Sequence, residues 1–299
     1  MTDSPASTID IGTFGIWTAR LDLHPTSTGR EVVAELDAMG WGALWRPEST
    51  GRDPLITAAL WLDSCDRMAV ATGIAQTYAR HPLTMNAGAR TLCEAFPGRF
   101  LLGLGVSHAP MVEGVRGLDY SHPLRDMSEY LDAMDASPFT GQGPTERPPR
   151  VLAALGPRML ALSAEKADGA HPYFAPPEHT AIARESIGPN AFLAPEQMVL
   201  LETDPDRARM VARANMARYL TLPNYTNNLK RLGFTEEDIT GISDRLVDAI
   251  VLWGDLDHIV AGIRAHLDAG ANHVCVQALV ERSDELPVDD WRRLAEALI

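Results

Sequence analysis

One arrangement of residues recurs at the start, middle and end of the chain: a helix-like run, a glycine, then a short apolar run. The three copies span residues 32–48, 160–174 and 263–279, with glycines at Gly40, Gly169 and Gly270. A glycine that ends a helix adopts the left-handed conformation easily, so the chain can turn at once into a strand. A helix followed so closely by a strand is typical of parallel-sheet proteins. We therefore expect one alternation of strand and helix along the whole chain.

Short apolar runs supply the other strands, because strands buried on both faces are apolar throughout. The eight predicted strands begin near residues 13, 43, 68, 99, 150, 169, 197 and 272. Helical periodicity separates them, as at Ile259, Ile263 and Leu267. Eight parallel strands in 299 residues predict an α/β fold, a (β/α)₈ TIM barrel, and the alternative is an open doubly wound sheet.

Composition indicates a single domain over residues 1–299, because 45% hydrophobic content supplies a large core. No run reaches the ~20 apolar residues that cross a bilayer, and a net charge of −14 argues against nucleic-acid binding, so we expect neither a membrane nor a nucleic-acid partner. The start lacks the features of a signal peptide, so we expect residues 1–10 to fray. Cys65, Cys93 and Cys275 lack metal-ligand spacing and are expected to be buried thiols in the cytoplasm.

Two segments interrupt the alternation. Residues 137–149 are too rich in proline and glycine for a helix and predict a loop. Residues 221–254 predict an inserted helical segment between strands 7 and 8, with a capping box at Thr235 and Asp238. An insertion after a barrel strand lies on the catalytic face, so this segment is a candidate lid or substrate wall. A dimer contact or an inert addition is the alternative.

The catalytic residues of a barrel lie where its strands end. Strand 4 reads FLLGLGVSHAP, in which Gly103 and Gly105 allow a flat ligand to approach the backbone and Ser107 and His108 follow at the rim. The alternative is that the two glycines relieve crowding inside the barrel. The run fails the dinucleotide fingerprint G-x-G-x-x-G because His108 stands in the third glycine position.

Other strand ends add aromatic and cationic groups. Trp45 ends strand 2 and can stack on an aromatic ligand, although a lone tryptophan in a strand is more often core. After strand 5, Gly156 and Pro157 open a helix with Arg158 in its first turn, which predicts an anion site at the helix N-terminus. His171 follows strand 6 and places a second histidine on the predicted rim.

Several reaction classes lack their sequence motifs. The chain has no H-E-x-x-H, no clustered cysteines and histidines, no Walker A sequence and no G-x-S-x-G. We therefore expect no metal site. Glu48 is the one clear carboxylate at a strand end, which weakens a glycosidase interpretation. The remaining groups suit a bulky planar cofactor with a phosphate tail.

Four runs make the chain recognisable: PGRFLLGLGVSHAP, TGIAQTYARHP, MLALSAEKADGAHPY and AGANHVCVQAL. Together they resemble the luciferase-like monooxygenase superfamily, in particular its actinobacterial coenzyme F420-dependent oxidoreductases, over residues 12–280. The resemblance implies a barrel that holds a deazaflavin (coenzyme F420) or, alternatively, FMN at the strand ends, beside a small-molecule substrate. It implies hydride transfer by an F420-dependent oxidoreductase, with an FMN-dependent monooxygenase and a non-catalytic cofactor-binding protein as alternatives.

The same resemblance implies roles for individual residues. A non-proline cis peptide that supports the ring is expected at Thr72–Gly73, and the strand-2 acidic position matches Glu48. The implied phosphate-binding turn comprises Leu155, Gly156, Pro157 and Met159.

The chain departs from the sugar-phosphate dehydrogenases of the superfamily, which have a catalytic histidine where Ser49 stands. We therefore expect His108, which matches a polar position near the ring, to be the catalytic acid or base. The resemblance also implies a homodimer, for which the helix 53–65 offers the apolar side chains Leu55, Leu60, Trp61 and Leu62.

Overall fold

The computed structural model describes residues 9–282 and 284–299. The tail predicted over residues 1–10 lies, as far as residue 8, outside the described residues. Each of the eight predicted strands is present and begins within two residues of its predicted start. They are β1 (Phe14–Trp17), β2 (Ala43–Arg46), β3 (Ala69–Thr72), β5 (Phe100–Gly105), β6 (Arg150–Leu152), β7 (Gly169–Ala170), β9 (Glu196–Leu200) and β11 (Val274–Ala278). Three short strands were not predicted: β4 (Ala75–Gln76), β8 (Phe192–Leu193) and β10 (Val251–Trp253).

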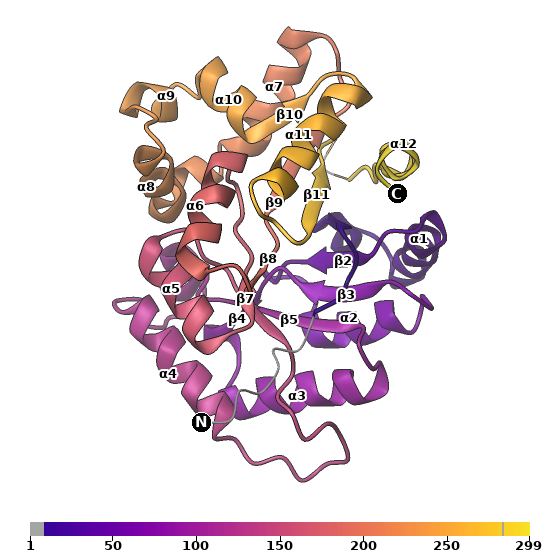
Figure 1. Ribbon diagram of the computed structural model, residues 1–299, viewed down its shortest axis with the longest axis vertical. Helices are drawn as coiled ribbons and strands as arrows, with labels where there is room; N and C mark the ends of the chain where they lie inside the picture. The colour runs from indigo at the N-terminus through magenta and orange to yellow at the C-terminus, as the bar shows by residue number, and fades with distance from the viewer. Residues whose placement is uncertain (1–8, 283) are drawn as a thin grey trace.

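Helices cover the outside of the strands (Figure 1). They are α1 (Thr26–Met39), α2 (Pro54–Leu62), α3 (Pro82–Ala95), α4 (Pro123–Asp135), α5 (Pro157–Lys166), α6 (Pro177–Ile187), α7 (Pro205–Met216), α11 (Leu256–Asp268) and α12 (Val288–Leu298). The last helix, α12, packs against both α1 and α11, so the outer layer continues from the C-terminal part of the chain to the N-terminal part.

Residues 192–200 close the barrel. Parallel pairing runs in the order β11, β1, β2, β3, β5, β6, β7 and β8, and β9 pairs with β11. Only Ala194 and Pro195 separate β8 from β9. The Ala194 N–H donates to Ala170 O in β7 (3.0 Å), and the Cys275 N–H in β11 donates to Pro195 O (2.9 Å). One segment thus bonds to both edges, which confirms the (β/α)₈ barrel against an open doubly wound sheet.

Two of the three repeated glycines act as predicted. Gly40 and Gly270 follow their helices with φ of 95° and 99°. Gly169 is different, and the prediction for it is wrong: α5 ends at Lys166, and Gly169 is already the first residue of β7. A Cβ at Gly169 would lie 1.8 Å from the carbonyl oxygen of Phe192. Close strand packing, and not a left-handed turn, therefore explains this glycine.

The segment 221–254 contains helices and one strand between β9 and α11. Its helices are α8 (Pro223–Arg231), α9 (Glu236–Thr240) and α10 (Asp244–Ile250), and β10 pairs with β9. The predicted capping box is present, because the Asp238 N–H donates to Thr235 Oγ1 (3.1 Å) and the Thr235 N–H donates to Asp238 Oδ2 (3.0 Å). Residues 137–149 contain neither helix nor strand, as predicted.

Helix α2, which we expected to contribute to a dimer, buries most of its apolar surface within the subunit. Trp61 and Leu62 have no exposed surface and pack in the core. Ile56 is the large apolar residue that α2 leaves exposed, at 66%. Any partner of this helix would therefore contact Ile56 and not Trp61 or Leu62.

The glycines of β5 make room for neighbouring chain. A Cβ at Gly103 would lie 1.9 Å from Thr72 O, and one at Gly105 would lie 2.5 Å from Ile74 Cδ1. Thr72 is fully buried and holds Gly103 in place: its hydroxyl donates to Gly103 O (2.7 Å) and accepts from the Gly103 N–H (2.8 Å). Relief of crowding is therefore what these glycines provide in the barrel itself.

We predict that Gly103→Ala destabilises the fold by about 3 kcal/mol or more, because a backbone atom must move to admit the methyl group. The matched control is Gly114→Ala, where a Cβ would meet no atom within 4 Å. Urea unfolding of both variants measures the difference. Equal stability of the two variants would show that β3 and β5 separate at little cost.

Candidate cofactor and active site

The carboxyl ends of the strands form the mouth of the barrel, where the cis peptide lies between Gly73 and Ile74. Our prediction of Thr72–Gly73 is wrong by one residue. The Gly73 N–H still donates to Arg46 O of β2 (2.7 Å), so the regular strand pairing continues through Gly73 and the chain leaves the sheet after it. Trp17 Nε1 donates to Gly73 O (3.1 Å) and fixes this turn from β1.

Glu48 lies at the predicted strand end, but its carboxylate already has partners. It pairs with Arg80 through two hydrogen bonds (2.9 and 2.8 Å) and accepts from the Gln76 N–H (2.7 Å). Only 7% of the side chain is exposed. Glu48 therefore holds the chain that follows β3 in place. Ser49 is exposed beside it.

Trp45 and His171 lie inside the barrel. For Trp45 the alternative of a core residue is confirmed, and the rim position predicted for His171 is wrong. Trp45 has no exposed surface, its ring stacks on His171 at 4.4 Å between centroids, and its Nε1 donates to His273 Nε2 (3.0 Å). His171 Nδ1 donates to Ala194 O (2.7 Å). Burial lowers the pKa of His171 to about 4, so the ring is neutral at pH 7.

His108 does lie at the mouth, half-buried on the loop after β5. Ser107 before it adopts a left-handed φ of 59°, and the Ser107 carbonyl accepts from the Tyr120 hydroxyl (2.8 Å). Burial lowers the pKa of His108, and a hydrogen bond with Asn224 partly offsets this. The His108 ring lies 5.5 Å from the ring of Tyr225. Because α8 supplies both neighbours, the segment 221–254 forms part of the wall of the mouth.

The N-terminus of α5 is the anion site that the sequence predicted; we call Leu155–Met159 the α5 seat. Gly156 precedes the helix, and no side chain caps its first N–H groups. Arg158 is exposed and has no hydrogen bond or ion pair with the residues that the structure describes. The Leu155 carbonyl is turned toward His179, whose Nε2 lies 2.9 Å away.

Arg231, the last residue of α8, completes the α5 seat and was missed by the sequence analysis. Its Nη2 lies 3.6 Å from the position of a Cβ on Gly156. Within the described part of the chain it bonds only to Asn228 Oδ1 (3.3 Å) and has no carboxylate partner. The sequence offers one indication of its role: Arg231 is a basic residue at the end of a helix in the segment 221–254, which the sequence predicts to lie on the catalytic face.

An aromatic group over the mouth was also missed. Tyr173 lies at its centre: its ring is 4.9 Å from Trp17 and 5.4 Å from Tyr219, and its hydroxyl is 2.6 Å from the Tyr219 hydroxyl. The Tyr173 hydroxyl also donates to Gln277 Oε1 (2.8 Å). We call Trp17, Tyr173 and Tyr219 the aromatic wall. Trp17 is the last residue of β1, and Tyr173 comes three residues after β7. An aromatic residue close to a strand end is the signal that could have identified both.

Glu196 is a buried acid that no sequence motif identifies. It begins β9 with 1% exposure, and its Oε2 accepts from the Phe174 N–H (3.1 Å). Its Oε1 has no partner among the described residues. Burial raises the pKa of Glu196 to about 8, so the carboxyl is largely protonated at pH 7.

The raised pKa of Glu196 predicts that the stability of the protein depends on pH. Its folded-state pKa lies above the unfolded value, so the folded state binds more protons and stability falls as pH rises from about 4.5 to about 8. The rise of the pKa from 4.5 to about 8 corresponds to a loss of stability on the order of 5 kcal/mol. Glu196→Gln should remove it, and the variant should unfold at a higher temperature than wild type at pH 9.

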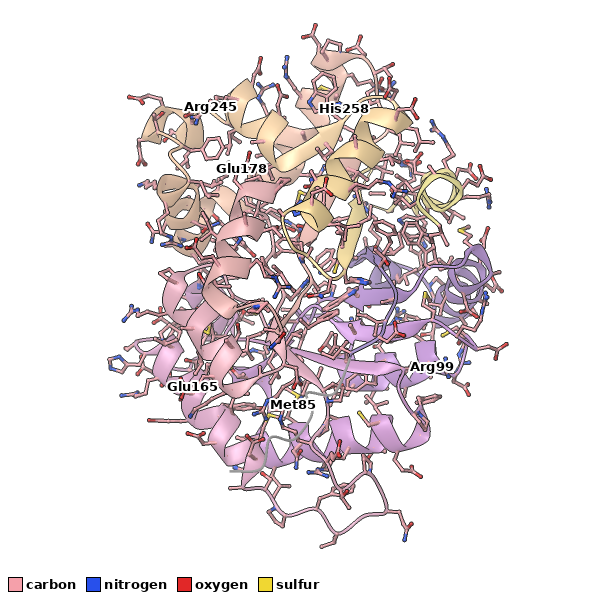
Figure 2. All side chains as sticks on the ribbon, viewed as in Figure 1. Met85, Arg99, Glu165, Glu178, Arg245 and His258 are labelled. Carbon is pink, nitrogen blue, oxygen red and sulfur yellow. The ribbon has the colours of Figure 1, made fainter. Side chains whose placement is uncertain are left out.

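The control is Glu165→Gln, an exposed acid on α5 (Figure 2). Thermal unfolding at pH 5, 7 and 9 compares the three proteins. A Glu196→Gln variant that loses as much stability as wild type between pH 5 and 9 would contradict the assignment of this pH dependence to Glu196.

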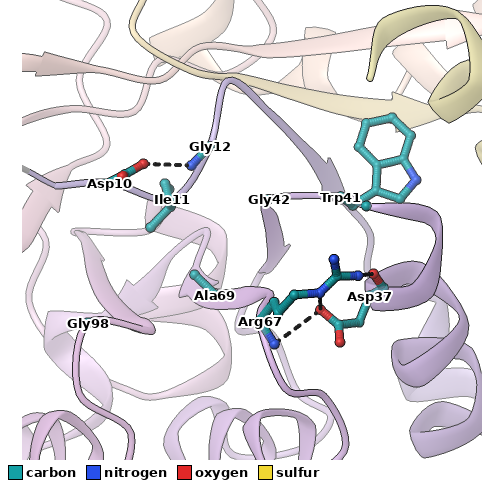
Figure 3. Close-up of a pocket in the computed structure, with 10 residues that line it drawn as sticks. Asp10, Ile11, Gly12, Asp37, Trp41, Gly42, Arg67, Ala69 and Gly98 are labelled. Atoms are coloured by element: carbon teal, nitrogen blue, oxygen red, sulfur yellow. Dashed lines mark hydrogen bonds and ion pairs between the residues drawn. The ribbon is translucent and has the colours of Figure 1, made fainter.

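Two hollows lie away from the mouth. One of about 250 Å³ lies among the loops that precede β1, β2 and β3, where the Asp37 side chain pairs with Arg67 (Figure 3). The other, of about 550 Å³, lies beside β10 and includes Trp253 and His258.

In residues 9–282 and 284–299 no group of histidine, cysteine and acidic side chains could hold a metal ion. No helix in the same ranges is long and apolar enough to cross a membrane.

Comparison with known proteins identifies the family. The family model for luciferase-like monooxygenases matches residues 11–273. The chain is 28% identical to the protein named "Putative coenzyme F420-dependent oxidoreductase Rv3520c" from Mycobacterium tuberculosis, with 88% of this chain and 93% of the relative covered.

Two solved structures share the fold. An F420-dependent secondary alcohol dehydrogenase in complex with an F420-acetone adduct has a TM-score of 0.75 at 14% identity, with 96% of this chain and 98% of that chain covered. The oxygenating constituent of 3,6-diketocamphane monooxygenase from Pseudomonas putida, in complex with FMN, has a TM-score of 0.71 at 16% identity, with 96% and 97% covered. The match to the family model covers most of the barrel, and the chain belongs to the luciferase-like monooxygenase family.

Proposed function

We propose that this protein is an oxidoreductase that transfers a hydride between a reduced deazaflavin, coenzyme F420, and a small organic substrate. The observation that carries the proposal is the α5 seat, where neither Arg158 nor Arg231 has a carboxylate partner among the residues that the structure describes, in a chain of net charge −14. Cations left unpaired beside a helix N-terminus suit a phosphate group. The mycobacterial relative supports a deazaflavin.

The residues at the mouth fit such a cofactor. Arg158 and Arg231 would bind its phosphate, with Leu155 and Met159 beside them. Gly73, Gly105 and Ser107 lie along the β3 and β5 side of the mouth, where the planar ring would rest. Thr72, Glu48 and Trp45 act indirectly in this proposal, because their side chains bond to Gly103, Arg80 and His273.

His108 is the proposed catalytic residue. When bound, the deazaflavin supplies the hydride chemistry. Because burial lowers the pKa of His108, its ring is neutral at pH 7 and can accept the proton of a substrate hydroxyl. In the opposite direction the protonated ring returns that proton. The hydrogen bond with Asn224 would hold the ring in one orientation.

The FMN-bound monooxygenase of similar fold supports a second candidate, an FMN-dependent monooxygenase. Both candidates use the same mouth and the same phosphate site. The homodimer and the cytoplasmic location stay predictions.

Arg158→Ala and Arg231→Ala are each expected to weaken the binding of reduced deazaflavin about tenfold, because each removes a charge-assisted contact to phosphate. The loss should shrink as salt is added, since exposed charges are screened. Anaerobic fluorescence titrations with deazaflavin and with FMN measure both affinities.

The matched control is Arg125→Ala, which removes an exposed arginine of α4 that pairs with Asp126. Unchanged deazaflavin affinity in all three variants would overturn the α5 seat. Tighter binding of FMN than of deazaflavin would favour the monooxygenase instead.

The variant His108→Ala should turn over about 10²- to 10⁴-fold more slowly than wild type. Its affinity for deazaflavin should change little. In wild type, kcat/KM is measured in the direction in which His108 accepts the proton of the substrate hydroxyl. It should rise with pH through the lowered pKa of His108 and level off at neutral pH. His108→Gln should lack this rise, whereas the control His122→Gln, an exposed histidine, should keep it. Turnover of His108→Gln at the wild-type rate would exclude the catalytic role.

A further inference from the structure

A second cationic group lies at the mouth, away from the α5 seat. Arg218 follows α7, and its guanidinium carbon lies 4.5 Å from the centroid of the Tyr219 ring. Arg218 also donates a hydrogen bond to the Tyr219 hydroxyl. The side chain is accessible to solvent, and within the described part of the chain it has no carboxylate partner.

Arg20 brings a second positive charge close to Arg218. It begins a short 3₁₀ helix after β1 and donates to the Arg282 carbonyl (2.9 Å). Desolvation and then the positive charge of Arg218 lower the pKa of Arg20, while Glu285 and Asp284 oppose this to a smaller extent. Two neighbouring guanidinium groups raise the positive potential at this end of the mouth, which favours the binding of an anion there.

A chain of hydrogen bonds connects Arg218 to the centre of the mouth. Tyr173 donates to Gln277, so its oxygen accepts from the Tyr219 hydroxyl, which in turn accepts from Arg218. The ring of Tyr173 packs on Trp17, which bonds to the carbonyl of the cis peptide. The aromatic wall therefore extends from Arg218 to the place proposed for the cofactor ring.

Arg20 and Arg218 lie on a different side of the barrel from the α5 seat. Arg20 follows β1, whereas the α5 seat follows β6, and β2, β3 and β5 lie between those strands. With eight strands in the closed barrel, β1 and β6 are on opposite sides. An anion at Arg218 would therefore face the cofactor across the mouth and would not compete for its phosphate site.

We propose that Arg218, assisted by Arg20, binds the carboxylate of a small organic acid whose flat body packs on Tyr173. A guanidinium matches the two oxygens of a carboxylate, and an aromatic face suits a planar body. The inference rests on the proposed function in one respect, that the substrate occupies the mouth. It narrows that substrate to an organic carboxylate.

Isothermal titration of the cofactor-free protein with benzoate and with neutral benzamide tests the site. Benzoate should bind wild type at least about tenfold more tightly than benzamide, and Arg218→Ala should weaken benzoate about 10- to 100-fold without affecting benzamide. Arg218→Lys, which keeps the charge without the planar fork, should lose part of the affinity. Arg293→Ala, an exposed arginine of α12, removes the same charge elsewhere and should bind like wild type.

Three outcomes would overturn the proposal: no binding of benzoate to wild type, equal affinity in wild type and Arg218→Ala, or loss of binding in Arg231→Ala in place of Arg218→Ala. The last would place the carboxylate at the α5 seat. Because the titration contains no cofactor, its result is independent of deazaflavin binding. A protein that binds benzoate through Arg218 but not deazaflavin would disprove the proposed function alone.

Discussion

The closure of the barrel by residues 192–200 is the constraint on which the other features depend. Backbone hydrogen bonds to β7 on one side and to β11 on the other leave no free strand edge there. The interior is consequently shielded from bulk solvent, and burial there shifts the pKa values of its titratable groups toward the neutral form. His171, His273 and Glu196 all show this, the first two with pKa values lowered to about 4 and the third with a pKa raised to about 8.

The same segment shapes the mouth above it. Glu196 accepts from the Phe174 N–H, and Phe174 adopts a left-handed φ of 59°. That turn directs the chain after β7 back across the barrel and leaves Tyr173 over the centre, against Trp17 from β1 and Tyr219 from the far end of α7. The hydrogen bond that Glu196 accepts from the Phe174 N–H thus supports the turn beside Tyr173 in the aromatic wall.

Much of the fold could be predicted from the sequence because its signals are local. A glycine after a helix, a capping box and a bounded apolar run each involve a few adjacent residues, and Gly40, Thr235 and the eight strand starts are confirmed. Residues at the mouth of the barrel are harder to predict. The strands of a parallel barrel are apolar on both faces, so the sequence pattern does not show at which residue a strand ends. The apolar pattern therefore does not separate a rim position from an interior one for Trp45 and His171, and it locates the cis peptide only to within one residue.

The residues that the sequence analysis missed are brought to the site by tertiary contacts alone. Arg231 lies 75 residues beyond Gly156 in the sequence, and its role depends on how α8 folds over the mouth. Glu196 is an ordinary acid at the start of an apolar strand until the barrel closes around it. Neither carries a motif. Within the described part of the chain, Arg231 has no carboxylate partner and Glu196 Oε1 has no hydrogen-bond partner, and only the folded chain reveals this.

Helix α8 has one further consequence. Its nine residues contact His108 through Asn224 and Tyr225 in the first turn and reach the α5 seat through Arg231 at the last position. One short helix thus joins two places at the mouth. In the proposed function, an anion held by Arg231 would also restrain Asn224 and Tyr225, and with them the orientation of His108.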